Sequence, residues 1–214
     1  VGPAEVLTLM REDLGRPDAA AKFRHMFSNN PAVNRLAAAR IFLFASRDVW
    51  FVVALPVFFR SEHDWTFWQA GGFLALWTIG YGIVQASAPR LLRRRSEEHG
   101  SDPDGGTAMR LAFVLAVWPA AIATAISVGA DPVLSVVIGL LIFGVVFALN
   151  SAVHSYLILA YADGDKVAMN VGFYYMANAG GRLIGTVLSG AVYMWQGLEA
   201  CLWLSAAFIL AAAM

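Results

Sequence analysis

The sequence predicts an all-α integral membrane protein whose main part is a six-transmembrane-helix bundle. Of the 214 residues, 59% are apolar and 14% are charged, whereas an ordinary soluble domain carries about 25% charged residues. Apolar runs long enough to cross a bilayer, about 20 residues each, recur along the chain. Short polar turns separate these runs. The pattern excludes a disordered chain and argues against a soluble globule.

The first 34 residues differ from the rest of the chain. Residues 11–24 are rich in charged side chains, and Phe23, Met26 and Phe27 follow at helical spacing. This pattern predicts a short amphipathic helix on the membrane surface. We therefore divide the chain into a cytoplasmic linker, residues 1–34, and the bundle, residues 35–214.

Six spans follow the linker, separated by turns rich in Gly, Pro, Asp and Asn. The predicted spans are 35–59, 65–88, 108–129, 133–159, 168–195 and 198–214. The last is short, because the chain stops inside an apolar run at Met214. Because Val1 is not an initiator Met either, we expect a piece of a longer protein.

The basic residues predict the orientation. With the N-terminal segment in the cytoplasm, the inner segments hold eleven Lys and Arg residues and the outer loops hold only Arg60. Cytoplasmic loops of membrane proteins carry this excess of basic residues. We expect an inner (plasma) membrane protein with 89–107 and 163–166 inside and with 60–64 and 130–132 outside.

The predicted spans differ in polarity. The third and sixth offer few polar side chains and are expected to face lipid. The first, second, fourth and fifth carry Arg, Asp, Gln, Asn, His and Tyr residues. Ionisable groups within a bilayer are costly unless they face a bundle interior or a wet cavity. These four spans are therefore expected to surround a polar space.

Three arginines lie within the spans. Arg40 and Arg47 are seven residues apart and share a helix face, and Arg182 lies near the middle of the fifth span. A guanidinium pair suits phosphate or carboxylate, because its planar fork binds both oxygens. We predict that Arg47 and Arg182 hold an anion, the alternative being structural ion pairs. Arg40 either joins them or extends to the inner surface.

Other polar residues extend the candidate site. Asp48 either pairs with the arginines or carries a coupling proton. His154 either packs with a hydrogen bond or contacts substrate or relays protons. The predicted substrate-binding residues are Arg40, Arg47, Arg182, Asn150, His154, Tyr175 and Asn178.

One stripe of small residues predicts helix packing. Ala177, Gly181, Gly185 and Ser189 recur every four residues on the fifth span. Such a stripe allows close contact with a neighbouring helix. No catalytic constellation, phosphate loop or metal-ligand spacing is apparent, and the single cysteine, Cys201, excludes an internal disulfide. We expect no enzyme activity and no cofactor or metal.

The arrangement resembles the C-terminal half of a major facilitator superfamily transporter. The features that carry the resemblance are six spans with a cytoplasmic start, polar spans one, two, four and five, and a basic inner loop after the second span. The run from Gly80 to Arg95 resembles that family's inner-loop motif without its usual acidic residue. The resemblance implies a missing N-terminal six-helix half and rocking of two bundles about a central site.

Longer blocks are similar to the organoarsenical efflux permeases of the ArsJ family. The most specific blocks are RDVWFVVALP and GFYYMANAGGRLIGTVLSG, and similarity covers nearly the whole chain. It implies export of 1-arseno-3-phosphoglycerate, which a glyceraldehyde-3-phosphate dehydrogenase partner makes. The balance of 15 basic and 15 acidic residues separately argues against a nucleic-acid partner. The alternatives are a major facilitator exporter of another organic or phosphorylated anion, a polytopic membrane enzyme, and a structural or signalling membrane protein.

Overall fold

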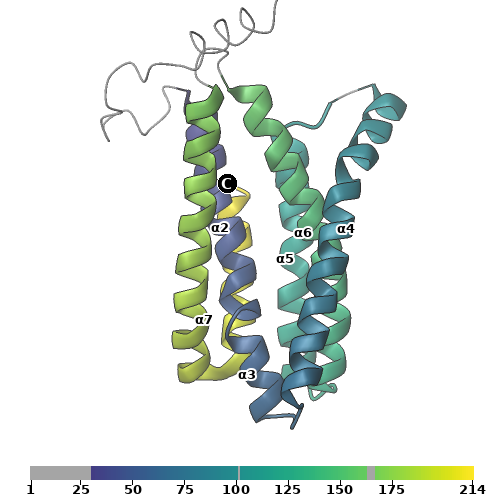
Figure 1. The fold of residues 1–214 in the computed structure, drawn as a ribbon, viewed down its shortest axis with the longest axis vertical. Helices are drawn as coiled ribbons and strands as arrows, with labels where there is room; N and C mark the ends of the chain where they lie inside the picture. Colours follow the sequence, from purple (N-terminus) through teal and green to yellow (C-terminus); the bar gives the residue numbers. More distant parts are fainter. Residues whose placement is uncertain (1–29, 101, 163–166) are drawn as a thin grey trace, which may run out of the picture.

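The computed structural model describes residues 30–100, 102–162 and 167–214, and this part of the chain is helical without any strand. The helices are α2 (Pro31–Phe51), α3 (Ala54–Ser61), α4 (Phe67–His99), α5 (Gly105–Ser127), α6 (Pro132–Tyr161) and α7 (Val167–Ala212). They run along the long axis of the molecule, with α2 and α7 on one side, α4 on the other and α6 between (Figure 1).

Within the described residues, four stretches are long and apolar enough to cross a membrane. They are Pro31–Ser61, Gly105–Ser127, Pro132–Tyr161 and Met169–Ala212. An all-α membrane protein is thus confirmed at this level. The predicted second span, 65–88, is helical from Phe67 onward within α4 but is not among the four. The predicted amphipathic helix of the linker and the turn at 163–166 lie outside the described residues.

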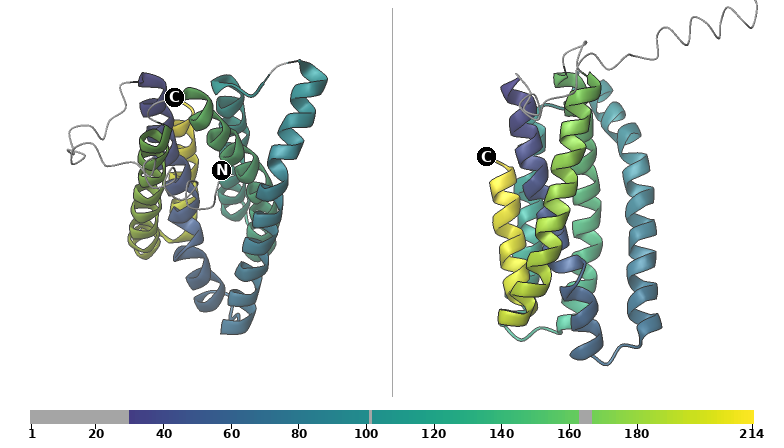
Figure 2. Two further views of the ribbon diagram at one scale, coloured as in Figure 1. Left: turned by 45° about the horizontal axis from the view of Figure 1, so that its top comes forward. Right: turned by 60° about the vertical axis from the view of Figure 1, so that its left-hand side comes forward.

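The predicted fifth and sixth spans both fall within α7. Gly197 separates them, because its backbone has φ 74° and ψ −168°. Glycine adopts a positive φ without the steric cost that a Cβ imposes. Figure 2 shows the chain reversing there, so that residues 198–212 return beside 167–196. The turn expected at Gln196 and Gly197 is therefore present.

Polar side chains begin three of the helices. Asn30 Oδ1 accepts a hydrogen bond from the Ala32 amide at 2.9 Å, and Asp131 Oδ1 accepts one from the Leu134 amide at 2.7 Å. Asp104 accepts from both the amide and the hydroxyl of Thr107. These caps satisfy amides that a helix N-terminus leaves unpaired. The bonds from the Thr107 side chain and amide also lower the pKa of the exposed Asp104 carboxyl.

The predicted first span is not one continuous helix. It breaks between α2 and α3 at Val52 and Val53. Pro56 explains the break, since a proline ring clashes with the carbonyl four residues earlier and has no amide hydrogen for it. The Val53 and Ala54 amides donate instead to Ser189 Oγ of α7, at 3.3 and 3.0 Å. A side chain of α7 thus completes the broken helix.

Aromatic side chains fill the core between α2, α4 and α6. Trp50 packs edge-on against Phe143 with ring centroids 5.3 Å apart. The Trp77 indole donates to the Leu140 carbonyl at 3.0 Å. It lies against Gly144, where a Cβ would come within 2.9 Å of the ring. These contacts hold α6 beside both α2 and α4.

Candidate functional site

The small-residue stripe of α7 lies directly against α2. A Cβ on Gly181 would overlap the Ile41 carbonyl oxygen, and one on Gly185 would lie 2.7 Å from the Ala45 carbonyl oxygen. Both glycines are buried, as are Ala177 and Ser189. The two backbones therefore touch where side chains would ordinarily separate them.

This close approach brings Asp48 of α2 to α7. A Cβ on Gly185 would lie 2.9 Å from the Asp48 Cβ, and the whole Asp48 residue is buried. Arg182, one turn before Gly185, donates from Nε to Asp48 Oδ2 at 3.2 Å. Close packing and the interhelical ion pair therefore depend on the same stretch of α7.

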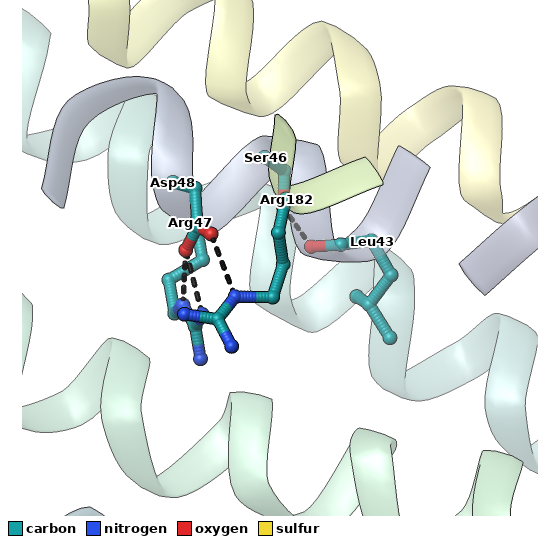
Figure 3. A network of polar contacts seen from close by, with 5 residues as sticks. All are labelled: Leu43, Ser46, Arg47, Asp48 and Arg182. Carbon is teal, nitrogen blue, oxygen red and sulfur yellow. Dashed lines mark hydrogen bonds and ion pairs between the residues drawn. The ribbon is translucent and has the colours of Figure 1, made fainter. Parts of the chain in front are cut away.

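Asp48 holds a second guanidinium as well. Arg47 donates from Nε to Asp48 Oδ1 at 2.7 Å, and its Nη2 lies 2.6 Å from the same oxygen. Figure 3 shows both guanidinium groups approaching the carboxylate from one side. We call Arg47, Asp48 and Arg182 the Asp48 triad. The ion-pair role considered for Asp48 is thus present, whereas its role in proton coupling stays a prediction.

The three side chains of the triad differ in exposure. The Asp48 side chain is 1% exposed, that of Arg47 is 12% and that of Arg182 is 58%. Two cations and one carboxylate leave a net positive charge. Since the carboxylate is buried and Arg182 is open, the excess charge is accessible from the Arg182 side. Anion binding by Arg47 and Arg182 stays a prediction that this geometry allows.

Two further candidates lie on the accessible side of α7. Tyr175 is 60% exposed, two turns before Arg182. Asn178 is half-buried, and its Oδ1 has no hydrogen-bond partner among the described residues. Tyr175, Asn178 and Arg182 therefore form a polar face that adjoins the stripe packed against α2, since adjacent helix positions are about 100° apart.

Arg40 lies apart from the triad. It is 4% exposed and donates from Nη1 to Ser151 of α6, at 3.0 Å to Oγ and 3.2 Å to the carbonyl oxygen. Its guanidinium carbon lies 4.1 Å from the Phe44 ring centroid and 4.8 Å from that of Tyr174. The predicted alternative in which Arg40 extends to the inner surface is wrong, because its side chain lies buried between helices.

Two buried polar residues of α6, Asn150 and His154, lie near Ser151, the residue that Arg40 of α2 contacts. Asn150 is fully buried and His154 is 2% exposed. Neither side-chain polar atom of Asn150 has a hydrogen-bond partner among the described residues. The same holds for Nδ1 of His154. The hydrogen bond expected for a packing histidine is therefore missing at this nitrogen. His154 also lines a hollow of about 220 Å³ together with Arg35 and Tyr161.

Sequence reasoning missed the aromatic residues of the site. The Phe44 ring contacts both Arg40 and Arg47, whose guanidinium carbon lies 5.1 Å from its centroid. Phe147 of α6 also contacts Arg47, at 5.5 Å. Phe44 is four residues after Arg40 and three before Arg47, and such residues neighbour one another on a helix. That spacing was visible in the sequence.

Comparison with known proteins assigns no family to the chain. No protein-family model matches it, and no curated protein matches it. The function is therefore inferred from the helices, the Asp48 triad and the residues around Arg40.

Proposed function

We propose that this chain is the C-terminal half of a major facilitator exporter of the ArsJ type. Its substrate is the organoarsenical anion 1-arseno-3-phosphoglycerate, and the export confers arsenate resistance. One observation carries the proposal. Two arginines from different helices converge on one buried carboxylate and leave a net positive charge open on the α7 side.

The triad has the chemistry of an anion site. Arg182 uses its Nε for Asp48, so its terminal nitrogens are the donors for an incoming oxyanion. Arg47 is held against the same carboxylate and is already oriented before an anion arrives. Charge-assisted hydrogen bonds of this kind are about twice as strong as neutral ones. The apolar surroundings of a membrane protein strengthen them further.

The proposal also assigns the rest of the transporter. Six spans form one half if α4 is counted and α7 is counted as two arms. In this proposal a second six-helix half precedes Val1 and covers the polar face. Rocking of the two halves exposes the site to either side of the membrane in turn. The membrane is the inner (plasma) membrane, and a glyceraldehyde-3-phosphate dehydrogenase supplies the substrate in the cytoplasm. Asp48 is the candidate for coupling export to protons.

A second candidate function is export of another organic or phosphorylated anion. The triad favours it equally, because guanidinium groups bind the oxygens of phosphate and arsenate alike. Transport assays that compare arsenate-derived with ordinary phosphorylated compounds separate the two candidates. Membrane-enzyme chemistry has less support, since within the described ranges no group of three or more His, Cys, Asp or Glu gathers as a metal site would require.

The test is arsenate resistance in cells that express the full-length protein together with the dehydrogenase. Arg47→Lys and Arg182→Lys are each expected to reduce resistance at normal membrane abundance, because lysine keeps the charge but loses the planar fork. Alanine variants are expected to be worse. Arg93→Lys is the matched control, since Arg93 is 79% exposed on α4.

A quantitative blot of the membrane fraction separates the alternatives. A purely structural role predicts that abundance falls together with resistance and that lysine is as harmful as alanine. Normal resistance in both the lysine and the alanine variants would remove Arg47 and Arg182 from the substrate site.

A further inference from the structure

Arg40 is a buried cation without a carboxylate partner among the described residues. The ion pairs of this part of the chain join Asp48 to Arg47 and Arg182, and Arg93 to Glu97. The hydrogen bonds of Arg40 go to the neutral Ser151. A buried charge without a counterion is strongly unfavourable. The Phe44 and Tyr174 rings stabilise the guanidinium by cation–π contact but do not neutralise it.

Further buried polar groups without partners lie on the helices that pack around this cation. Arg40 Nε, both side-chain polar atoms of Asn150 and Asn170 Nδ2 have no hydrogen-bond partner in the described ranges. Their residues are 4%, 0% and 2% exposed. Buried polar groups in folded proteins are nearly always paired, with protein or with a bound species. A cation with several unpaired N–H groups is the complement of an anion.

Three helices bring these groups together. Arg40 on α2 bonds Ser151 on α6, and Asn150 is the adjacent residue. Tyr174 on α7 lies under the guanidinium, and Asn170 is one turn before it. The Tyr174 hydroxyl lies near Ser155 without a hydrogen bond of standard geometry. His154 follows Asn150 by one turn on α6, and a neutral imidazole donates from one of its ring nitrogens.

We propose that Arg40, with Asn150, Asn170 and Tyr174, forms a second anion site that is separate from the Asp48 triad. Phe44 lies between the two sites. Its ring centroid is 4.1 Å from the guanidinium carbon of Arg40 and 5.1 Å from that of Arg47. The ligand is a small oxyanion. Its source is either free inorganic phosphate or the second anionic group of a substrate held at the triad. The inference rests on the anion chemistry of the proposed function and does not require an arsenical.

The experiment measures thermal unfolding of the purified full-length protein in detergent. The probes are inorganic phosphate, with one anionic group, and 3-phosphoglycerate, with two. The variants are Arg40→Met, Arg182→Met and, as the matched control, Arg93→Met. A ligand that binds only the folded protein raises its unfolding temperature, and the stabilisation grows with the logarithm of the ligand concentration above its Kd.

Each source predicts its own pattern. If free phosphate occupies the Arg40 site, phosphate still stabilises Arg182→Met, and its apparent Kd rises about tenfold in Arg40→Met, which is the loss of one charge-assisted contact. If the second group of the substrate occupies it, 3-phosphoglycerate binds the wild type more tightly than phosphate, and Arg40→Met removes that advantage. Arg93→Met behaves as the wild type in both cases.

A carboxylate placed beside Arg40 keeps the proposal testable if Arg40→Met does not fold. Ser151→Asp supplies an internal counterion at the atom that Arg40 Nη1 already contacts. The variant is expected to unfold at a higher temperature without added anion and to lose the response assigned to Arg40. Equal responses in the wild type, Arg40→Met and Ser151→Asp, or no response in the wild type, overturn the proposal. If the resistance assay fails for Arg47 and Arg182 while the Arg40 dependence holds, the second site stands without the proposed substrate.

Discussion

The two faces of α7 differ in what their residues do. The packed face, made by Ala177, Gly181, Gly185 and Ser189, lies against α2, where two of its members leave no room for a Cβ. The open face carries Tyr175, Arg182 and exposed apolar side chains such as Leu183. Adjacent positions on a helix are about 100° apart. Neighbours such as Gly181 and Arg182 therefore serve packing and chemistry side by side.

Packing on one face of α7 therefore positions the charged group on the other. Arg182 reaches Asp48 because Gly185 allows α2 to approach α7 closely. A larger residue on the packed face would separate the two helices and lengthen the ion pair. Four sets of substitutions test this dependence, and they follow in order of expected effect.

The largest effect is expected at the ion pairs of Asp48, which join α7 to α2. Asp48→Asn leaves the 12%-exposed Arg47 without a counterion, and removal of one partner from a buried pair costs about 3–5 kcal/mol. Arg182→Met is expected to cost less, about 1 kcal/mol, because Arg182 is largely exposed. Thermal unfolding in detergent measures both. Equal losses would mean that Arg182 is covered in the full-length protein.

The second effect compares two adjacent glycines. Gly181→Ala is expected to destabilise the protein by about 1–3 kcal/mol, the usual range for overpacking, because its methyl group overlaps the Ile41 carbonyl. A Cβ on Gly180 meets nothing within 4 Å. Gly180→Ala is therefore expected to keep or raise stability, since alanine favours helix over glycine by about 1 kcal/mol. Membrane abundance and unfolding temperature together check the pair, and identical behaviour would contradict the packing of α7 on α2.

The third effect concerns the break between α2 and α3. Ser189→Ala leaves the Val53 and Ala54 amides without their acceptor, and a buried amide without a partner costs about 1–3 kcal/mol. Ser87→Ala is the control, because the Ser87 hydroxyl bonds the Ile83 carbonyl of its own helix. Hydrogen exchange at residues 53 and 54 is expected to accelerate in Ser189→Ala only. Unchanged exchange would show that another group accepts from these amides.

The smallest effect is expected on the open face. Leu183 is 68% exposed, and surface substitutions usually change stability by less than about 0.5 kcal/mol. Leu183→Ala is therefore expected to unfold at nearly the wild-type temperature. A loss of the size expected for Gly181→Ala would show that another helix packs over this residue, and the distinction between the two faces would then fail there.

The sequence predicts periodic features of this molecule better than its interruptions. The four-residue stripe of α7 and the turn at Gly197 follow from residue types alone and are present in the structure. The break at Val52 and Val53 was missed, although Pro56 has no amide hydrogen to donate to the carbonyl of residue 52. The expected span over 65–88 corresponds to a helix within α4 that is not among the stretches apolar enough to cross a membrane.

The sequence predicted the charged residues of the candidate site but not which of them lie together. Arg47, Asp48 and Arg182 are conspicuous because charge is rare in apolar runs. The structure was needed to separate Arg40 from them, because the direction of its side chain depends on Phe44, Tyr174 and Ser151 from three helices. Sequence spacing fixes which residues share one helix face, whereas contacts between helices depend on tertiary packing.

The polar contacts between α2 and α7 also fix the register of these two helices. Gly181 faces Ile41 and Gly185 faces Ala45, so the helices run parallel, and a slide of one turn, about 5.4 Å, would match small residues to the same surface again. The ion pair of Arg182 with Asp48 and the bond of Ser189 to Val53 and Ala54 oppose such a slide. Loss of the Arg182 guanidinium removes one of these two restraints, and Ser189 then remains as the polar anchor between α7 and α2.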